Sequence, residues 1–382
     1  MRLKRRLVIS KPQLVLVGVA VAAIGILVVL VVRASNTAGA VEAESGQVGN
    51  GAVAGPHTGA SDGKAVVFTA AITSTPSPAT DPAPGGSGNV AAVSTAAQLT
   101  AALAAARPGD TIMLADGTYS GQFVAAGAGT ATAPITLKGG RQAILDGGST
   151  SSGYAFHLNG ASYWVLDGFS LKGAQKGLVG DNTQHSTLQN LSITGTGQEG
   201  LHLRAASSDN VIKGNTITDT GLVKPDFGEG IYLGSASSNW ATYSGGQPDK
   251  SDRNQVISNT VARTGAESLD IKEGSTGGLI RDNSFDGTGM SGANFADSWV
   301  DVKGNNYTLT NNRGVKALLD GFQVHSVVSG WGLNNTFSAN TAQVDGPGYG
   351  FSIDSKATGT VVKCDNTASG AAAGLSNIAC TP

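Results

Sequence analysis

The sequence predicts an all-β fold, a parallel β-helix in which short strands stack coil upon coil, and three observations favour it. The 382 residues include 55 Gly, 14% charged and 5% aromatic residues, so the chain is rich in turns and lacks long amphipathic helical runs. Pairs of apolar residues one residue apart recur from about residue 177, at spacings from 22 to 38 residues. Asparagines recur after the strand that follows each pair, and repeats of this size are typical of a solenoid.

The repeat is defined by two sets of residues. The apolar pairs are Leu201/Leu203, Ile231/Leu233, Leu269/Ile271, Val300/Val302, Phe322/Val324 and Phe351/Ile353. The asparagines are Asn190, Asn215, Asn259, Asn283, Asn312, Asn340 and Asn366. Successive side chains of a strand face opposite ways, so each pair is expected to face the core and the residues between to face outward. The asparagines are expected to form an amide ladder at a bend.

The N-terminal part of the chain is expected to lie outside the folded domain. A basic segment, 1–13, precedes the 19 apolar residues 14–32, which are long enough to cross a membrane as one helix. We therefore expect a transmembrane signal-anchor, with a single pass through the cell membrane and the C-terminal domain extracellular. Ala38-Gly39-Ala40 leaves open a cleaved signal peptide, which would make the protein secreted. Residues 33–88 are rich in Ala, Gly, Ser, Thr and Pro and are expected to be a disordered linker.

The folded domain is expected to span 89–382. Thr95 and Gln98 have the spacing of a capping box, which begins an Ala-rich helix that is expected to cover the exposed N-terminal end of the sheets. Cys364 and Cys380 are expected to form a disulfide near the C-terminus, because the chain is exported. Short strands are expected to follow the helix at 111–114, 116–119, 135–137 and 143–147.

Stacked coils place polar residues from distant parts of the sequence side by side. One outward column contains His202, Tyr232, Asp270, Asp301, Gln323 and Ser352, and the next contains Arg204, Gly234, Lys272, Lys303, His325 and Asp354. Glu199, Glu229, Glu267, Ser298, Asp320 and Tyr349 occupy the bend before each strand. Coils are about 4.8 Å apart, so Glu229 and Glu267 are expected to lie side by side with Asp270 and Asp301 alongside.

Carboxylates this close repel by roughly 3 kcal/mol at an effective dielectric constant near 20, and a cation between them removes that cost. Oxygen ligands without cysteine or paired histidines favour Ca²⁺. The alternative is that the acids and lysines form solvated ion pairs without function. The insertions 235–252, with Trp240 and Tyr243, and 286–299, with Trp299, could form groove walls that stack on sugars, or could simply pack onto the solenoid.

Several stretches resemble a known family. Val93–Thr95, Arg107–Asp110, Leu114–Tyr119 and Ala133–Leu137 resemble the N-terminal cap and first coils of pectate-lyase-like right-handed parallel β-helices, in particular polysaccharide lyases of the alginate lyase and chondroitinase B family. In that family a calcium-binding Glu and a catalytic Lys lie on one strand with four residues between them.

Glu267 and Lys272 have the same spacing in this sequence. The resemblance implies that Lys272 is the base and that Glu267 and Glu229 are calcium ligands. Where the family has an Arg in the next coil, this chain has Lys303. The family's Ser and His after these positions are Glu273 and Gly304 here.

These residues suit β-elimination of an acidic polysaccharide. Ca²⁺ held by Glu229, Glu267 and Asp270 would neutralise a uronate carboxylate, and Lys272 would remove the neighbouring proton. Lys303 or His325 would protonate the departing glycosidic oxygen. The residues expected to bind substrate are Tyr232, Trp240, Trp299, Asp301 and Gln323. We therefore expect a Ca²⁺-assisted polysaccharide lyase that is a monomer.

Two other functions remain open. A glycoside hydrolase on the same fold could use a carboxyl pair from Asp270, Asp301 and Asp320, although the chain lacks the Asp-Asp dipeptide typical of polygalacturonases. A non-catalytic surface protein could bind glycan along the same groove. The net charge of −2 and the lack of a basic stripe beyond the N-terminus make nucleic acid an unlikely partner.

Overall fold

The computed structural model of the chain divides it into two compact units, Met1–Pro82 and Ala83–Pro382. It describes residues 18–20, 28–30, 52–56, 64–68 and 88–382. In the first unit β1 (Gly18–Ala20) pairs with β2 (Val28–Leu30), and β3 (Ala52–Pro56) with β4 (Lys64–Phe68), both antiparallel. Most of the predicted membrane segment 14–32 and of the predicted linker 33–88 lies outside the described residues. No helix of the described residues has the length and apolar character needed to cross a membrane.

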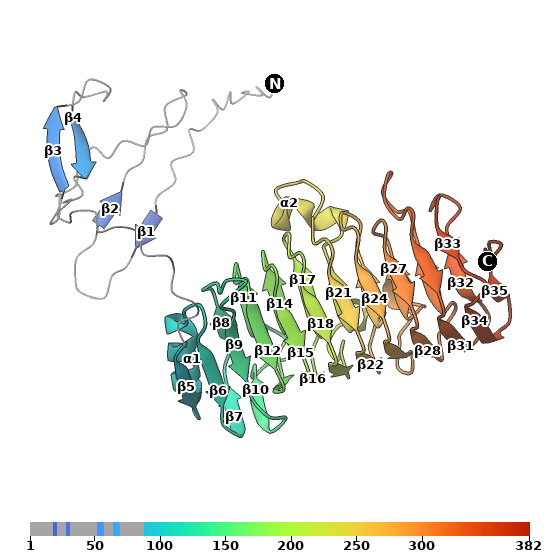
Figure 1. Cartoon of the computed structure of the whole chain (residues 1–382), viewed down its shortest axis with the longest axis horizontal. Helices are drawn as coiled ribbons and strands as arrows, with labels where there is room; N and C mark the ends of the chain where they lie inside the picture. Colours follow the sequence, from blue (N-terminus) through green and yellow to red (C-terminus); the bar gives the residue numbers. More distant parts are fainter. Residues whose placement is uncertain (1–17, 21–27, 31–51, 57–63, 69–87) are drawn as a thin grey trace, which may run out of the picture. The chain divides into compact units, whose positions relative to one another are not determined.

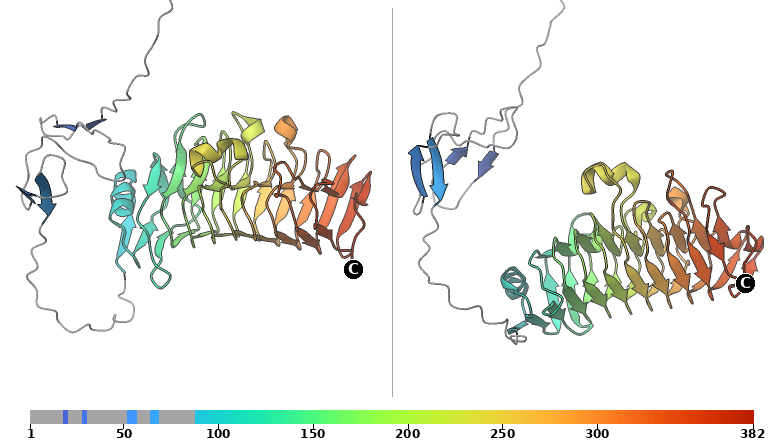
Figure 2. Two further views of the ribbon diagram at one scale, coloured as in Figure 1. Left: turned by 90° about the horizontal axis from the view of Figure 1, so that it is seen from above. Right: turned by 45° about the horizontal axis from the view of Figure 1, so that its top comes forward.

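The second unit is an all-β solenoid of three parallel sheets, in which each full coil adds one strand to each sheet (Figures 1 and 2). Sheet 1 contains β5 (Val90–Val93), β6 (Thr111–Leu114), β9 (Ile135–Lys138), β12 (Trp164–Asp167), β15 (Thr187–Gln189), β18 (Val211–Lys213), β21 (Gln255–Ile257), β24 (Leu279–Arg281), β27 (Thr308–Thr310), β30 (Thr336–Ser338) and β33 (Val361–Val362). Sheet 2 contains β7 (Gly117–Ser120), β10 (Ala143–Asp146), β13 (Ser170–Lys172), β16 (Ser192–Thr194), β19 (Thr216–Thr218), β22 (Thr260–Ala262), β25 (Ser284–Asp286), β28 (Arg313–Val315), β31 (Thr341–Gly346) and β34 (Thr367–Ala371). Sheet 3 contains β8 (Phe123–Ala125), β11 (Tyr154–Asn159), β14 (Lys176–Asp181), β17 (Leu201–Arg204), β20 (Ile231–Leu233), β23 (Leu269–Ile271), β26 (Val300–Val302), β29 (Phe322–Val324), β32 (Tyr349–Ile353) and β35 (Gly374–Ser376).

The helices are short and lie at one end of the solenoid or in its loops. They are α1 (Ala96–Ala105), η1 (Pro225–Phe227), η2 (Ser237–Asn239), α2 (Trp240–Tyr243) and η3 (Ala293–Phe295). Helix α1 begins after Thr95, whose side chain accepts a hydrogen bond from the backbone N–H of Gln98, while the Gln98 side chain accepts one from the N–H of Thr95. Leu99 and Leu103 bury the inner side of the helix. That this helix protects the end of the sheets stays a prediction.

The predicted register of sheet 3 is confirmed. Leu201 pairs with Ile231, Ile231 with Leu269, and Leu269 with Val300, and the series continues through Phe322 to Phe351. All six side chains are fully buried and form one continuous core ladder. The rings of Phe322 and Phe351 stack with centroids 5.1 Å apart. The alternation of apolar and polar residues therefore places the polar column on the outside of the same sheet.

The predicted amide ladder is present from Asn215 to Asn366. Each Nδ2 donates to the Oδ1 of the next asparagine at 2.9–3.0 Å, and each backbone N–H except the last donates to the same atom. The prediction that Asn190 belongs to the ladder is wrong. Leu191 occupies the ladder position in that coil, and its N–H donates to Asn215 Oδ1. The Asn190 side chain instead donates to Asp167 on the surface. A second ladder at another bend, Asn210 to Asn254, was not predicted.

The far end of the solenoid carries a covalent link. Cys364 and Cys380 form a disulfide that joins the last turns of the chain. The described residues contain no free cysteine.

Candidate active site

The outward face of sheet 3 brings together most of the residues that the sequence analysis selected. Tyr232 pairs with Asp270, Asp270 with Asp301, and Asp301 with Gln323. Their side chains point away from the core, yet each of these residues is at most 9% exposed. Charged groups are therefore held in an environment that is largely shielded from water, where their interactions are strong.

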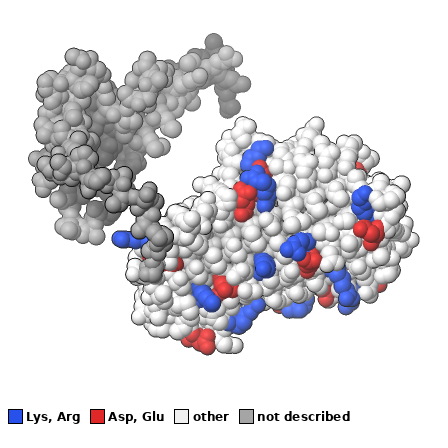
Figure 3. Space-filling model, in the orientation of Figure 1, with Lys and Arg blue, Asp and Glu red and all other residues white. Residues whose placement is uncertain are grey.

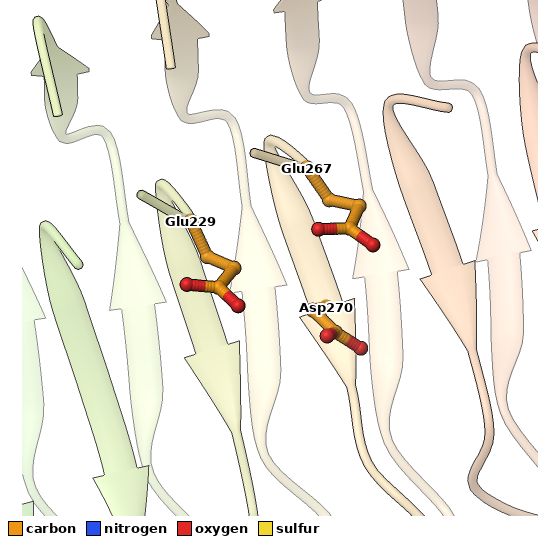
Figure 4. Close-up of side chains that lie close together, drawn as sticks. All are labelled: Glu229, Glu267 and Asp270. Atoms are coloured by element: carbon orange, nitrogen blue, oxygen red, sulfur yellow. The ribbon is translucent and has the colours of Figure 1, made fainter. Parts of the chain in front are cut away.

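Glu229, Glu267 and Asp270 form an acidic cluster on this face (Figure 4). Glu229 and Glu267 occupy the same position of the bend before β20 and β23, and Asp270 lies on β23. One carboxylate oxygen from each of the three residues lies within 4.8 Å of the others, and all three residues are buried. Oε2 of Glu229 has no hydrogen-bond partner among the described residues.

Two lysines and a histidine continue from this cluster in a chain of ion pairs. Nζ of Lys272 lies 2.5 Å from Asp270 Oδ2, and Nζ of Lys303 lies 2.9 Å from Asp270 Oδ1. Lys303 also lies 2.5 Å from Asp301 Oδ2, and Nδ1 of His325 lies 2.8 Å from Asp301 Oδ1. The lysines therefore occupy both oxygens of Asp270.

The protonation states follow from this geometry. Burial, together with the neighbouring carboxylates, raises the pKa of Glu267 to about 8 and that of Glu229 well above its usual range. Burial disfavours the ammonium form of Lys272, but Asp270, Glu229 and Glu267 outweigh it and raise the Lys272 pKa above its usual range. Lys272 is thus a cation at neutral pH, while both glutamates hold protons unless a cation replaces them.

The acidic cluster and the side chains paired with it have fewer positive than negative charges when all the acids are ionised. If Glu229, Glu267, Asp270 and Asp301 are all ionised, they face two ammonium groups and the His325 imidazole. The deficit is then one positive charge when His325 is protonated and two when it is neutral. Two protons or one divalent cation would balance the larger deficit. Glu229 and Glu267 have carboxylate oxygens that the lysines do not occupy, and hard oxygen ligands suit Ca²⁺. The two glutamates therefore fit a calcium ion beside Asp270, whose oxygens also contact the lysines, with water or substrate oxygens completing its six to eight ligands.

A pocket of about 210 Å³ lies next to the acidic cluster on the side of the preceding coils. Its walls include Glu229 and Tyr232, together with Glu199, His202 and Arg204 from β17 and the bend before it. The sequence analysis placed Glu199 at the bend and His202 and Arg204 in the outward columns but did not assign them to the site. The repeat gave the signal, because Glu199 and His202 occupy the same positions as Glu229 and Tyr232 one coil earlier.

Glu199 is the paired carboxylate of the pocket, whereas Oε2 of Glu229 and Nδ1 of His202 have no hydrogen-bond partner among the described residues. Lys176 contacts both oxygens of Glu199, and His202 Nδ1 lies 3.3 Å from Glu199 Oε1. Burial works against the charge of Glu199, but His202 and Lys176 lower its pKa to about 2. Burial lowers the pKa of His202, so it is neutral at neutral pH. Tyr232 lies between the two regions, with its ring centroid 4.2 Å from that of His202 and 5.1 Å from Lys272 Nζ.

The insertion 235–252 forms one wall of the pocket. Buried Asp249 accepts hydrogen bonds from the backbone N–H groups of Ala205 and Ala206, which fastens the insertion to the end of β17. Tyr243 of α2 lines the pocket. Trp240, which was predicted to bind substrate, instead donates from Nε1 to the carbonyl of Ser235 and is absent from the lining.

Three further residues that were predicted to bind substrate are largely engaged within the protein. Trp299 is fully buried, donates to the carbonyl of Val315 and packs on Phe322, so it belongs to the core. Gln323 is 4% exposed and donates to Asp297 and Asp320. Asp301 is held by Lys303 and His325. Trp299 and Asp301 offer no free polar group, whereas Oε1 of buried Gln323 has no hydrogen-bond partner among the described residues, so substrate binding by Gln323 stays a prediction.

The ion pairs also bear on the hydrolase alternative. A hydrolase needs one carboxylic acid that keeps its proton beside one carboxylate. Although burial opposes it, pairing with Lys303 and His325 lowers the pKa of Asp301, and both oxygens of Asp270 accept from lysines. Asp270 and Asp301 are therefore poor proton donors.

Elsewhere on the surface, charged side chains lie in small groups of both signs on the face shown in Figure 3.

Comparisons with known proteins agree with the architecture. The family profile described as Pel9A-like, right handed beta helix region matches residues 81–220. The crystal structure of an alginate lyase from Paenibacillus sp. str. FPU-7 is 38% identical, with a TM-score of 0.70, and the match covers 76% of this chain and 98% of that chain. Pectate lyase Pel9A is 18% identical with a TM-score of 0.49, covering 71% of this chain and 72% of that one.

A more distant structure shares only the fold. The enzymatically active domain of tailspike protein 2 from bacteriophage CBA120 is 10% identical with a TM-score of 0.50, and covers 85% of this chain and 46% of that one. No curated protein sequence matches the chain.

The three-sheet solenoid with a lysine and carboxylate face on one sheet defines a right-handed parallel β-helix of the pectate-lyase-like class. Within this class, the chain belongs to the family of the Paenibacillus alginate lyase, since the identity extends over nearly the whole of that enzyme.

Proposed function

We propose that the protein is a polysaccharide lyase that cleaves a uronate-containing polysaccharide by β-elimination, with alginate as the first substrate to test. The observation that carries the proposal is the 38% identity to an alginate lyase across 98% of that chain. The lysine and carboxylate face beside a pocket gives chemical support, because an elimination needs cations and proton-transfer groups at one place.

The reaction sets three requirements. β-Elimination removes the proton on C5 of a uronate and expels the glycosidic oxygen from C4, so the bond between C4 and C5 becomes double. The carboxylate next to C5 must be neutralised, one group must accept the C5 proton, and another must donate a proton to the departing oxygen. Lys272 and Lys303 supply the positive charge, since the surrounding carboxylates hold both as ammonium ions.

Two groups could accept the C5 proton. Lys272 can do so only when the charge of Glu229, Glu267 and Asp270 is compensated, because those carboxylates keep it protonated. Tyr232 lines the pocket beside the Lys272 ammonium, but burial, Asp270 and Glu229 raise the pKa of Tyr232 well above its usual range, so Tyr232 too needs the charge of these carboxylates to be compensated before it can transfer the proton. If Tyr232 transfers the proton, Tyr232→Phe should lower kcat by about 100-fold or more with little change in KM. If it only lines the pocket, KM should change instead.

Calcium is the cofactor that we propose for this site. Glu229, Glu267 and Asp270 would hold it, and when bound it would act as a Lewis acid toward the uronate carboxylate. The unpartnered oxygen of Glu229 and the deficit of positive charge support this assignment. Titration calorimetry of chelator-treated protein with Ca²⁺ should give one site, and Glu267→Gln should abolish it. Equal binding by the variant would rule out this location.

The proposed reaction is tested by incubating the full chain with alginate, pectate, chondroitin and dermatan, with and without a chelator. The expected result is ultraviolet absorbance from unsaturated uronate ends with at least one polymer, and loss of that signal in Lys272→Met. Retained binding without any product from all four polymers would favour the glycan-binding alternative.

We also propose, from the sequence alone, that segment 14–32 holds the protein in the cell membrane with its solenoid outside. Fractionation of cells should place the full-length protein in the membrane, accessible to added protease. Recovery of a shortened chain from the medium would instead indicate cleavage and secretion.

A further inference from the structure

The pocket beside the acidic cluster contains an arginine for which the elimination itself has no use. Arg204 ends β17 and is 4% exposed, yet it lines the pocket. Its Nε donates to Asp181 Oδ1 at 2.7 Å, and its Nη2 donates to the hydroxyl of Tyr154 at 3.0 Å. No hydrogen bond of the described residues uses Nη1. Nη1 is therefore the guanidinium nitrogen that remains available to a ligand in the pocket that Arg204 lines.

The insertion 235–252 holds this guanidinium in one orientation. The Cζ atom of Arg204 lies 4.1 Å from the ring centroid of Tyr243, so the ring covers one side of the cation. Asp249 binds the backbone of the two residues that follow Arg204, as described above. A donor fixed from both sides loses little freedom when it binds a ligand, which favours recognition.

The other walls of the pocket suit an acidic sugar. Lys224 adds a second exposed cation, and Phe227 adds an apolar ring with 44% of its surface exposed. Glu199 is already paired with Lys176, so it does not cancel the charge of Arg204. Asp181 lies outside the pocket lining but pairs with Arg204 through Nε and Nη2 and partly offsets its charge, so Arg204 contributes chiefly a fixed donor. Nη1 can therefore donate one charge-assisted hydrogen bond to a carboxylate in the pocket.

We propose that this pocket is a subsite for one uronate residue next to the scissile bond, and that Arg204 recognises the carboxylate of that residue. The position relative to the scissile bond rests on the proposed lyase function, since Glu229 and Tyr232 form the boundary between pocket and acidic cluster. The preference of the pocket for an anionic sugar is independent of turnover and can be measured separately.

The test is a binding cycle in the Lys272→Met background, so that nothing is cleaved. The ligands are a uronate oligosaccharide and the same oligosaccharide with its carboxyl groups reduced to alcohols, both measured by calorimetry. Arg204→Gln should weaken binding of the uronate form about 10- to 100-fold, the effect of one charge-assisted hydrogen bond. It should leave binding of the reduced form within about twofold. Arg204→Lys should recover part of the uronate affinity.

A matched control and a second variant keep the result interpretable. Arg263 binds Asp219 with the same two-bond geometry as a surface pair, and Arg263→Gln should change neither affinity. Tyr243→Ala keeps Arg204 but removes the ring that covers it, so it should give a smaller loss that is confined to the uronate form. If Arg204→Gln does not fold, the subsite is tested by comparing how Tyr243→Ala binds the uronate oligosaccharide and its reduced form.

Equal losses for the two ligands, or no loss for the uronate form, would overturn the subsite. The experiments distinguish a wrong subsite proposal from a wrong lyase proposal. Unsaturated product formed equally well by wild type and Arg204→Gln would remove the subsite alone. A uronate-specific binding loss in a protein that cleaves no uronate polymer would keep the subsite and remove the lyase.

Discussion

The charge deficit of the acidic cluster leads to a prediction about stability. The pKa of Glu267 is raised from 4.5 to about 8 in the folded protein by burial and by Asp270. An acid with a raised pKa takes up a proton on folding, so its contribution to the free energy of unfolding is greatest below pH 4.5 and falls as the pH rises through 8. At about 1.4 kcal/mol per pH unit, the fall amounts to at most roughly 5 kcal/mol.

Glu267→Gln should remove this fall, because glutamine resembles the protonated acid at every pH. The assay is denaturant or thermal unfolding from pH 5 to pH 9 in the presence of a chelator, where a loss of 5 kcal/mol corresponds to a melting shift on the order of 10 °C. Glu229 and His325 also have raised pKa values and titrate with the same sign, so a smaller slope should remain in the variant. Asp286→Asn is the matched control. Partial burial works against the charge of Asp286, but its bonds to Thr288 lower its pKa, so the carboxylate stays ionised from pH 5 to pH 9 and should not contribute to the slope.

Calcium should counteract the loss above pH 8, since it replaces the two protons. At a hundredfold excess over its Kd, the ion should stabilise wild type by about 3 kcal/mol and leave Glu267→Gln unchanged. An identical pH slope in wild type and Glu267→Gln would refute the reasoning about the cluster, whatever the effect of calcium.

Three further predictions concern the scaffold. Asn283→Ala should lower the free energy of unfolding by about 2–5 kcal/mol in denaturant melts, because it leaves buried backbone groups of the adjacent coils without partners. Surface Asn190→Ala should cost about 1–2 kcal/mol, chiefly because Asn190 has a φ of 54°, which alanine adopts less readily; a cost for Asn283→Ala no larger than this would contradict the ladder. Replacing Cys364 and Cys380 by serine should cost about 3 kcal/mol for a loop of this length and speed hydrogen exchange in the last coil, and unchanged exchange there would contradict it. Leu99→Ala should cost about 2–5 kcal/mol and expose β5 and β6 to exchange if α1 protects the end of the sheets; protection equal to wild type would show that it does not.

The sequence was sufficient to predict the stacking of the coils, because the alternation of apolar and polar residues identifies which side of each strand is buried. Neighbouring rungs share one register, so Leu201 to Phe351 could be aligned without a structure, and the stacking of Glu229 on Glu267 followed from it. The assignment of Asn190 to the amide ladder was wrong because a bend has no such alternation, and Leu191 occupies the ladder position in that coil.

The loops were less predictable because their contacts are not periodic. Trp299 was assigned to a groove wall, but small residues at Gly314 and Gly321 leave room for its ring in the core. The pocket depends on the insertion 235–252 folding back over β17, which the chain completed about 30 residues earlier. Nothing in the local sequence of Tyr243 indicates that it lies over Arg204, so the subsite became visible only in three dimensions.

The most direct test of the central claim is mass spectrometry of the products that the full chain releases from alginate. Elimination predicts fragments with an unsaturated uronate at one end, one water lighter than hydrolysis products, from wild type and none from Lys272→Met. Fragments that have gained water at the cleaved bond, or release that persists in Lys272→Met, would contradict the account.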